Sequence, residues 1–258
     1  MEEQLGLTAL FNQYLAGVGN SLLNLVHLTA KDPQHPWENW IVMELLVVAL
    51  LMIVAAVLRS SLSVENPGKL QHVFEMIRDF LKTSAEEAGV HHADHYLPYF
   101  GTLFIFILSM NLIGMVPAFE SPTQSPWVPA GLAIVTFFYY NIKGFQANGV
   151  GYLKHFMGPV LWLAPLMVVI ELMSHFIRPL SLTVRLFGNM FAGEQITNVF
   201  LTMPVPVWAA PLSKLVGVLI SLGLHVFVAL IQAYVFTLLT IIYVAAATEH
   251  GHEEELGH

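Results

Sequence analysis

Two apolar stretches near the end of the chain place the strongest limit on its fold. Residues 156–201 and 207–247 are each much longer than the roughly 20 residues that cross a bilayer. A helix of about 40 residues is about 60 Å long, twice the ~30 Å thickness of the hydrocarbon core. Each stretch is therefore either two short helices or one steeply tilted helix. Neither contains a clear turn signal in its middle, so we expect two long tilted helices packed as a hairpin.

Three shorter apolar segments precede these stretches, at residues 41–58, 97–116 and 130–142. Only 11% of the 258 residues are charged, against about 25% in soluble domains, and 56% are hydrophobic. So few charges cannot solvate the surface of a globular domain. We therefore expect an all-α integral membrane protein with about five membrane helices.

Two further segments are expected to be helical outside the hydrocarbon. The polar stretch 59–96 contains apolar residues at helical spacing, which predicts an amphipathic helix on the membrane surface: Leu70, Val73, Phe74, Ile77, Phe80 and Leu81. Residues 5–26 alternate irregularly, and are either an amphipathic segment on the membrane or a short extramembrane helix. The chain opens with acidic residues, unlike a secretory signal.

Positive charges predict the orientation. The loops that follow the first and third spans hold most of the basic residues: Arg59, Lys69, Arg78, Lys82, Lys143 and Lys154. The positive-inside rule places these loops in the cytoplasm and the N-terminus outside. We therefore divide the chain into an extracytoplasmic N-terminal segment (1–40), a membrane domain (41–248) and an acidic cytoplasmic tail (249–258).

Ionisable residues inside the fourth apolar stretch are the main candidates for function. An Arg at the bilayer centre costs roughly 2.5–3.5 kcal/mol on insertion scales, so it needs a partner or a wet cavity. Arg178 lies near the cytoplasmic third, where it can snorkel to the interface. Arg185 lies two turns deeper and has no acid on its own face, since Glu194 is nine residues away. We expect Arg185 to meet a charge supplied by another helix; the alternative is a packing ion pair within this chain.

The last stretch adds His225 and Gln232, which are seven residues apart and so nearly on one helix face. Closing the hairpin would bring His225 towards Glu194. A carboxylate and an imidazole in a wet cleft can both exchange protons. The alternative is a buried His that is satisfied by a backbone carbonyl.

Several other classes of site are not expected. Residues 91–95 read HHADH, but no partner ligand is in view, so a solvated loop is favoured over a metal site. The tail HGHEEELGH lacks the HExxH pattern, and no Gly-rich phosphate loop occurs. The chain has no Cys, which excludes disulfides and thiolate metal sites. A net charge of −8 without a basic patch makes a nucleic-acid partner unexpected. We expect no cofactor.

Three motifs together resemble subunit a of bacterial F-type ATP synthases: RPLSLTVRLFGNMFAGE, NLIGMVP, and LHVFVALIQAYVFTLLTIIY. They cover most of residues 95–245 at the family's spacing. The resemblance implies that Arg185 matches the arginine that faces the rotor carboxylate. It also implies that Asn189, Glu194, His225 and Gln232 match polar positions near that arginine or in the outer half-channel.

The resemblance further implies a non-catalytic stator subunit in the bacterial inner membrane. Its partners would be the rotor ring of c subunits and the b-subunit peripheral stalk. Protons would pass through two separate half-channels and drive rotation of the ring. A stand-alone secondary transporter is the first rival, but such transporters usually show repeat halves, and none is visible here. An intramembrane enzyme is the second, and it would need a nucleophile–base pair or a metal motif.

Overall fold

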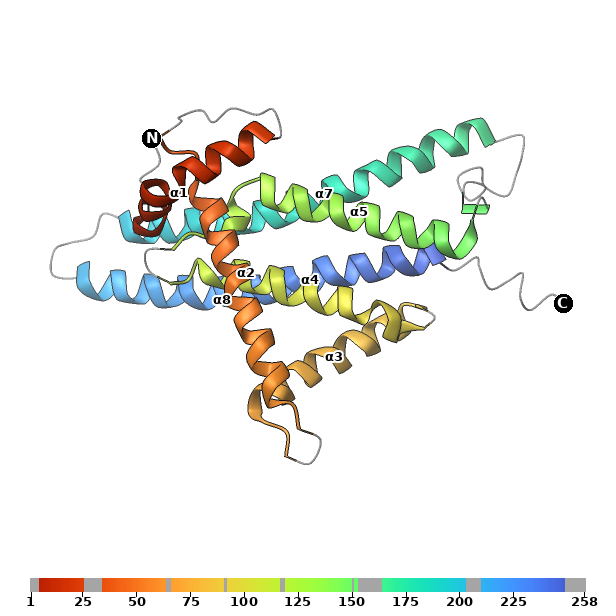
Figure 1. The fold of residues 1–258 in the computed structure, drawn as a ribbon, viewed down its shortest axis with the longest axis horizontal. Coiled ribbons are helices and arrows are strands. Elements are labelled where there is room, and N and C mark those ends of the chain that lie inside the picture. The colour runs from red at the N-terminus through yellow and green to blue at the C-terminus, as the bar shows by residue number, and fades with distance from the viewer. Residues whose placement is uncertain are drawn as a thin grey trace.

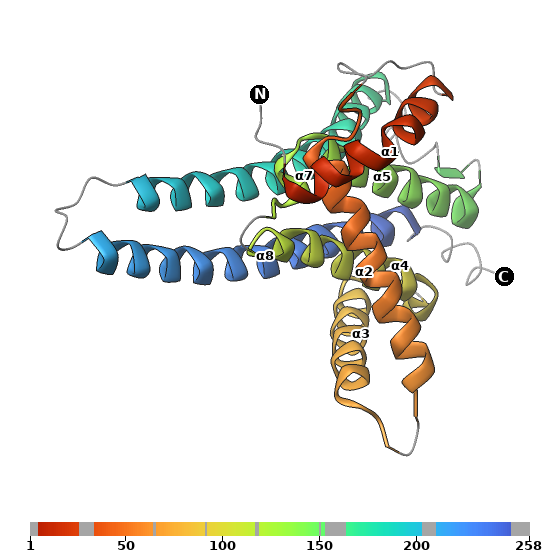
Figure 2. The same cartoon turned by 60° about the vertical axis from the view of Figure 1, so that its left-hand side comes forward.

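A computed structural model describes the greater part of the chain, and every regular element in this part is a helix. Two long antiparallel helices extend beyond the remaining helices at one end (Figures 1 and 2). The described residues are 5–25, 34–63, 66–90, 92–116, 119–149, 151–152, 164–202 and 210–248. Two parts of the chain named above lie outside these ranges: residues 153–163, which include Lys154, and the acidic tail.

The N-terminal segment forms helix α1 (Gly6–Leu25), which is held against the start of α2 (Asn39–Ser61). The backbone N of Trp37 donates to Asn12 Oδ1 at 3.0 Å, and Asn12 Nδ2 donates back to the Trp37 carbonyl at 3.1 Å. The indole Nε1 of Trp37 also donates to the Leu15 carbonyl at 2.9 Å. These bonds hold α1 against the segment that leads into α2. Contact of α1 with the membrane surface stays a prediction.

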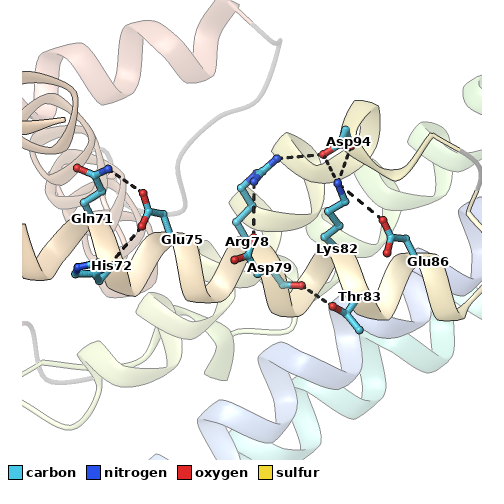
Figure 3. A network of polar contacts seen from close by, with 9 residues as sticks. All are labelled: Gln71, His72, Glu75, Arg78, Asp79, Lys82, Thr83, Glu86 and Asp94. Atoms are coloured by element: carbon cyan, nitrogen blue, oxygen red, sulfur yellow. Dashed lines mark hydrogen bonds and ion pairs between the residues drawn. The ribbon is translucent and has the colours of Figure 1, made fainter. Parts of the chain in front are cut away.

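The expected amphipathic helix is confirmed as α3 (Lys69–Glu87), which is followed by α4 (Ala93–Ile113). Leu81 is buried, whereas Leu70, Val73 and Phe80 are exposed, which suits a helix that faces a membrane surface. Asp94 at the start of α4 pairs with Lys82 at 2.9 Å and with Arg78 at 3.1 Å (Figure 3). The hydrogen bond to Asp94 raises the pKa of the Lys82 ammonium. Ion pairs at the surface add little to stability, so the main effect of these pairs is to orient α3 relative to α4.

A short polar cluster ties the Pro-rich loop to the end of α4. The loop contains a 3₁₀ turn, η1 (Pro122–Gln124). Thr123 Oγ1 donates to Asn111 Oδ1 at 2.8 Å, and Ser121 Oγ donates to the Met110 carbonyl at 2.8 Å. Gly114 makes the close approach possible, because a Cβ there would lie 2.8 Å from the Ser121 Cβ. The first part of the NLIGMVP motif, from the buried Asn111 to Gly114, therefore packs closely against the Pro-rich loop.

Four of the helices are long and apolar enough to cross a membrane: α2, α4, and the segments Leu166–Gly193 and Leu215–Thr248 of the last two helices. The third expected span, 130–142, lies within helix α5 (Trp127–Asn148), which is not one of the four. Its second half is more polar because it carries Tyr139, Tyr140, Asn141 and Lys143. The all-α membrane fold is confirmed, while a crossing by α5 stays a prediction.

The last two apolar stretches are single helices, as expected: α7 (Ala164–Thr202) and α8 (Ala210–Thr248). Each has 39 residues and so is about 58 Å long, which requires a steep tilt within a ~30 Å hydrocarbon core. They lie side by side in both views (Figures 1 and 2). Leu182, Leu186 and Met190, spaced four residues apart, form a buried stripe on α7. On α8 the small side chains Ala229 and Ala233 are fully buried, and small residues of this kind allow membrane helices to pack closely.

Candidate functional site

Arg185 lies on α7 within the membrane-crossing segment, and its side chain is exposed. No ion pair or hydrogen bond joins it to another side chain in the described part of the protein. An exposed guanidinium at this depth is costly in lipid. Helix α7 offers it no acid at i±3 or i±4, so this arginine needs a negative charge or water that its own turns of α7 do not supply.

Asn189, one turn after Arg185, links α7 to α8. Its side-chain Nδ2 donates a short hydrogen bond to Oε1 of Gln232. Asn189 is exposed, whereas Gln232 is 1% exposed. The Gln232 Nε2 atom is buried, and the described residues offer it no hydrogen-bond acceptor. The structure thus brings these two candidate residues together, with Asn189 one turn after Arg185 on α7.

His225 lies further along the hairpin, where α8 faces Gly193 of α7. A Cβ at Gly193 would lie 3.6 Å from the imidazole Nδ1, an ordinary van der Waals distance, so this turn of α7 packs directly against the ring. A crevice of about 10 Å³ opens here between the two helices. Its lining includes Asn189, Gly193, Ser221 and His225. A volume of about 10–15 Å³ is enough for one water molecule.

Glu194 directly follows Gly193 in α7, but its side chain lies outside the described part of the structure. The expected approach of Glu194 to His225 is therefore untested. The contact of the Gly193 position with the imidazole shows that this turn of α7 lies against His225.

A second polar group lies nearer the start of α7, and its contacts are with α7 itself and with helices α5 and α8. Arg178 lies 3.7 Å from Glu171, and its guanidinium lies 5.1 Å from the centre of the Tyr243 ring on α8. His175 Nε2 lies 2.9 Å from Asn141 Oδ1 on α5. Arg178 thus has partners within the chain, in addition to the snorkelling predicted for it, and so differs from Arg185. Sequence reasoning missed Asn141 and Tyr243, since no local pattern marks these contacts.

The HHADH segment does not form a site in the part that the structure describes. Asp94 binds Lys82 and Arg78, and His95 Nε2 lies 3.1 Å from Lys143 Nζ. His91 lies outside the described residues. The absence of a metal there stays a prediction.

Comparison with known proteins identifies the family of the chain. Residues 40–245 match the family described as "ATP synthase A chain", a range that contains Arg185, Asn189, Glu194, His225 and Gln232. The chain belongs to the ATP synthase A chain family. The ATP synthase subunit a of Solibacter usitatus is 54% identical over 94% of this chain and all of its own length. That of Koribacter versatilis is 46% identical over 98% of this chain and all of its own length. That of Nitratidesulfovibrio vulgaris is 40% identical over 90% of this chain and 95% of its own.

Membership of the ATP synthase A chain family agrees with the fold. The matched range begins at the second residue of α2 and ends three residues before the end of α8, so it covers nearly the whole of all four candidate spans. The chain is thus a multi-pass membrane component of an ATP synthase. Helix α1 precedes the match, although the relatives from Solibacter and Koribacter align over nearly the whole chain.

Proposed function

We propose that this chain is the proton-translocating stator subunit of an F-type ATP synthase. In this role it provides two aqueous half-channels that reach the middle of the membrane from opposite sides without joining. Arg185 faces a carboxylate on a rotor ring of c subunits, and a peripheral stalk of b subunits holds the chain stationary. ATP is made elsewhere in the complex, so the chain itself is not catalytic.

The observation that carries this proposal is that Arg185, on a helix long enough to cross a membrane, is exposed and has no ion pair or side-chain hydrogen bond among the described residues. A carboxylate on a neighbouring ring would supply the missing negative charge. A nearby cation favours the ionised form of an acid, so Arg185 would promote loss of the proton from each arriving site. The same positive charge would repel protons and keep the two half-channels apart.

The crevice at His225 supports an outer half-channel in this region of the hairpin. Its volume fits about one water molecule, which suits proton transfer in single file rather than an open pore. We assign Glu194 and His225 to the relay of protons, and Asn189 and Gln232 to its inner end beside Arg185. The buried Nε2 of Gln232 has no hydrogen-bond partner among the described residues, so it gives that end an additional donor for a water molecule.

Rotation would follow from the cost of charge in lipid. A protonated, neutral rotor site enters the hydrocarbon at little cost, whereas the ionised site does not. Each proton that crosses supplies about 2.3 kcal/mol per 100 mV of membrane potential, so several protons are needed for each ATP.

The positive-inside rule completes the placement. We propose that the chain lies in the bacterial inner membrane with its N-terminus outside and its C-terminus in the cytoplasm. The outer half-channel would then open towards the loop between α4 and α5, which carries Glu120 and no basic residue.

Cysteine cross-linking tests the contact with the rotor. The chain has no native Cys, so each introduced thiol is unique within it. Ala192 is exposed and lies seven residues after Arg185, hence on nearly the same face of α7. We expect Ala192→Cys to form a disulfide with a cysteine placed beside the rotor carboxylate. The buried Ala233→Cys serves as the matched control and should form none. Failure of Ala192→Cys to cross-link in an assembled complex would contradict the proposal.

A further inference from the structure

Helices α2, α3 and α4 form the sides of a triangle in the view of Figure 1, in which α4 lies along α8 and α2 and α3 extend away from it. A groove of about 670 Å³ lies between them. Apart from Arg59 and Thr102, all of the side chains that line it are apolar; they include Val48, Met52 and Ala55 of α2. Arg59 lies in the last turn of α2, at one end of the groove's α2 wall.

We propose that this groove holds the acyl chains of an anionic phospholipid, whose phosphate pairs with Arg59. The first support is the distribution of polarity. An apolar trough with a guanidinium at its end matches an amphiphile with an anionic head. The lining contains no acidic residue, and the described part of the chain gives Arg59 no ion pair. A guanidinium can bind two phosphate oxygens at once.

The second support is length. The distance along α2 from Val48 to Arg59 is eleven residues, or about 16 Å. This is close to half of the ~30 Å hydrocarbon core, which is the depth of one leaflet. A transmembrane helix of a partner subunit would need a groove that continues along all of α2. The groove thus fits a lipid of one leaflet better than a second membrane helix.

The third support is that the groove is formed from three separate elements. Phe74 of the amphipathic helix α3 and Ile105 and Phe106 of α4 complete its wall. Ordinary boundary lipid lies on a convex helix surface, whereas this trough would contact the acyl chains from several directions. A lipid held in this way would fill the space between α3 and the two spans, and it should leave more slowly than boundary lipid.

Two pairs of variants test the proposal in the purified, assembled ATP synthase. Ala55→Phe places a ring in the groove, and Ala56→Phe makes the same change at an exposed neighbour that does not line it. Arg59→Gln removes the charge at the groove, and Lys69→Gln removes an exposed positive charge that does not line it. The readout is the phospholipid that remains with the complex after extended detergent washing, identified by mass spectrometry.

The wild-type complex and the two control variants should retain about one more anionic phospholipid per chain than Ala55→Phe and Arg59→Gln do. A photo-reactive residue at position 55 should label lipid. Equal retention in all five proteins would overturn the proposal, as would labelling of a protein subunit from position 55. If Ala55→Phe does not assemble, the proposal is still tested by comparing Arg59→Gln with Lys69→Gln and by the labelling from position 55.

Discussion

Asn189 of α7 donates a hydrogen bond to Gln232 of α8, and this bond joins the two long helices one turn away from Arg185. The two residues are 43 positions apart in sequence. Gln232 is buried and Asn189 is exposed, so the bond connects the helix interface to the surface on which Arg185 lies. It therefore orients the polar surroundings of Arg185 and also contributes to the closure of the hairpin.

The first prediction concerns the energy of this bond. Asn189→Ala should destabilise the chain more than Gln232→Leu does, because it leaves a buried amide without its donor. The double variant should be little worse than Gln232→Leu alone. The coupling free energy should be about 0.6–1.7 kcal/mol, the range found for hydrogen bonds between membrane helices. Unfolding in mixed detergent micelles measures it, and strictly additive effects would show that the bond contributes nothing.

The second prediction concerns the outer half-channel. Glu194→Leu and His225→Leu should each slow proton flux by about tenfold or more, which corresponds to roughly 1.4 kcal/mol of added barrier. Assembly of the complex should be preserved. Gln195→Leu alters an exposed neighbour of Glu194 and serves as the control. Flux through the membrane sector in vesicles is the measurement; normal flux in both test variants would assign them a structural role only.

The continuity of α7 and α8 could be predicted because no cluster of turn residues interrupts either stretch. Pro179 did not break α7, although the interior of a helix normally excludes proline. The surroundings of Pro179 remain helical, and Thr183 Oγ1 donates to the Pro179 carbonyl at 2.9 Å. The ends of α5 were harder to predict, since its polar residues from Asn141 to Asn148 stay helical after the apolar run has ended.

The side chains that the polar residues contact were harder to predict from the sequence. Arg185 and Gln232 stand out because polar groups are rare in apolar stretches. The contacts of His175 with Asn141, and of Arg178 with Tyr243, depend on how α5, α7 and α8 pack. Such contacts between distant helices leave no periodic signal in a single sequence.

The third prediction concerns the buried corner at the end of α4. Gly114→Ala should destabilise the chain by about 1–3 kcal/mol, since its Cβ would lie 2.9 Å from the backbone N of Ser121. Gly101→Ala in the same helix is the matched control, because nothing lies within 4 Å of a Cβ there. Thermal unfolding of the purified chain compares the two. Equal melting temperatures would show that the corner relaxes freely.

The fourth prediction concerns topology. A reporter that is active only in the cytoplasm should be inactive when fused at position 120 and active when fused at position 250. A fusion at position 66, in the basic loop after α2, should match the one at 250. The same reading at 120 and 250 would contradict the proposed orientation.

The fifth prediction concerns Arg185. Arg185→Ala removes the cation that favours ionisation of the rotor site, so coupled ATP synthesis should be abolished. Passive proton leak should rise, because the charge that separates the half-channels is lost. Arg185→Lys keeps a charge but loses the planar, weakly hydrated guanidinium, and it should retain little coupled activity.

The decisive measurement is ATP synthesis and passive proton permeability in membrane vesicles that contain the Arg185→Ala complex, with assembly checked by blotting. The account predicts a fully assembled complex that makes no ATP and leaks protons faster than the wild type. An assembled Arg185→Ala complex that makes ATP at the wild-type rate would contradict it.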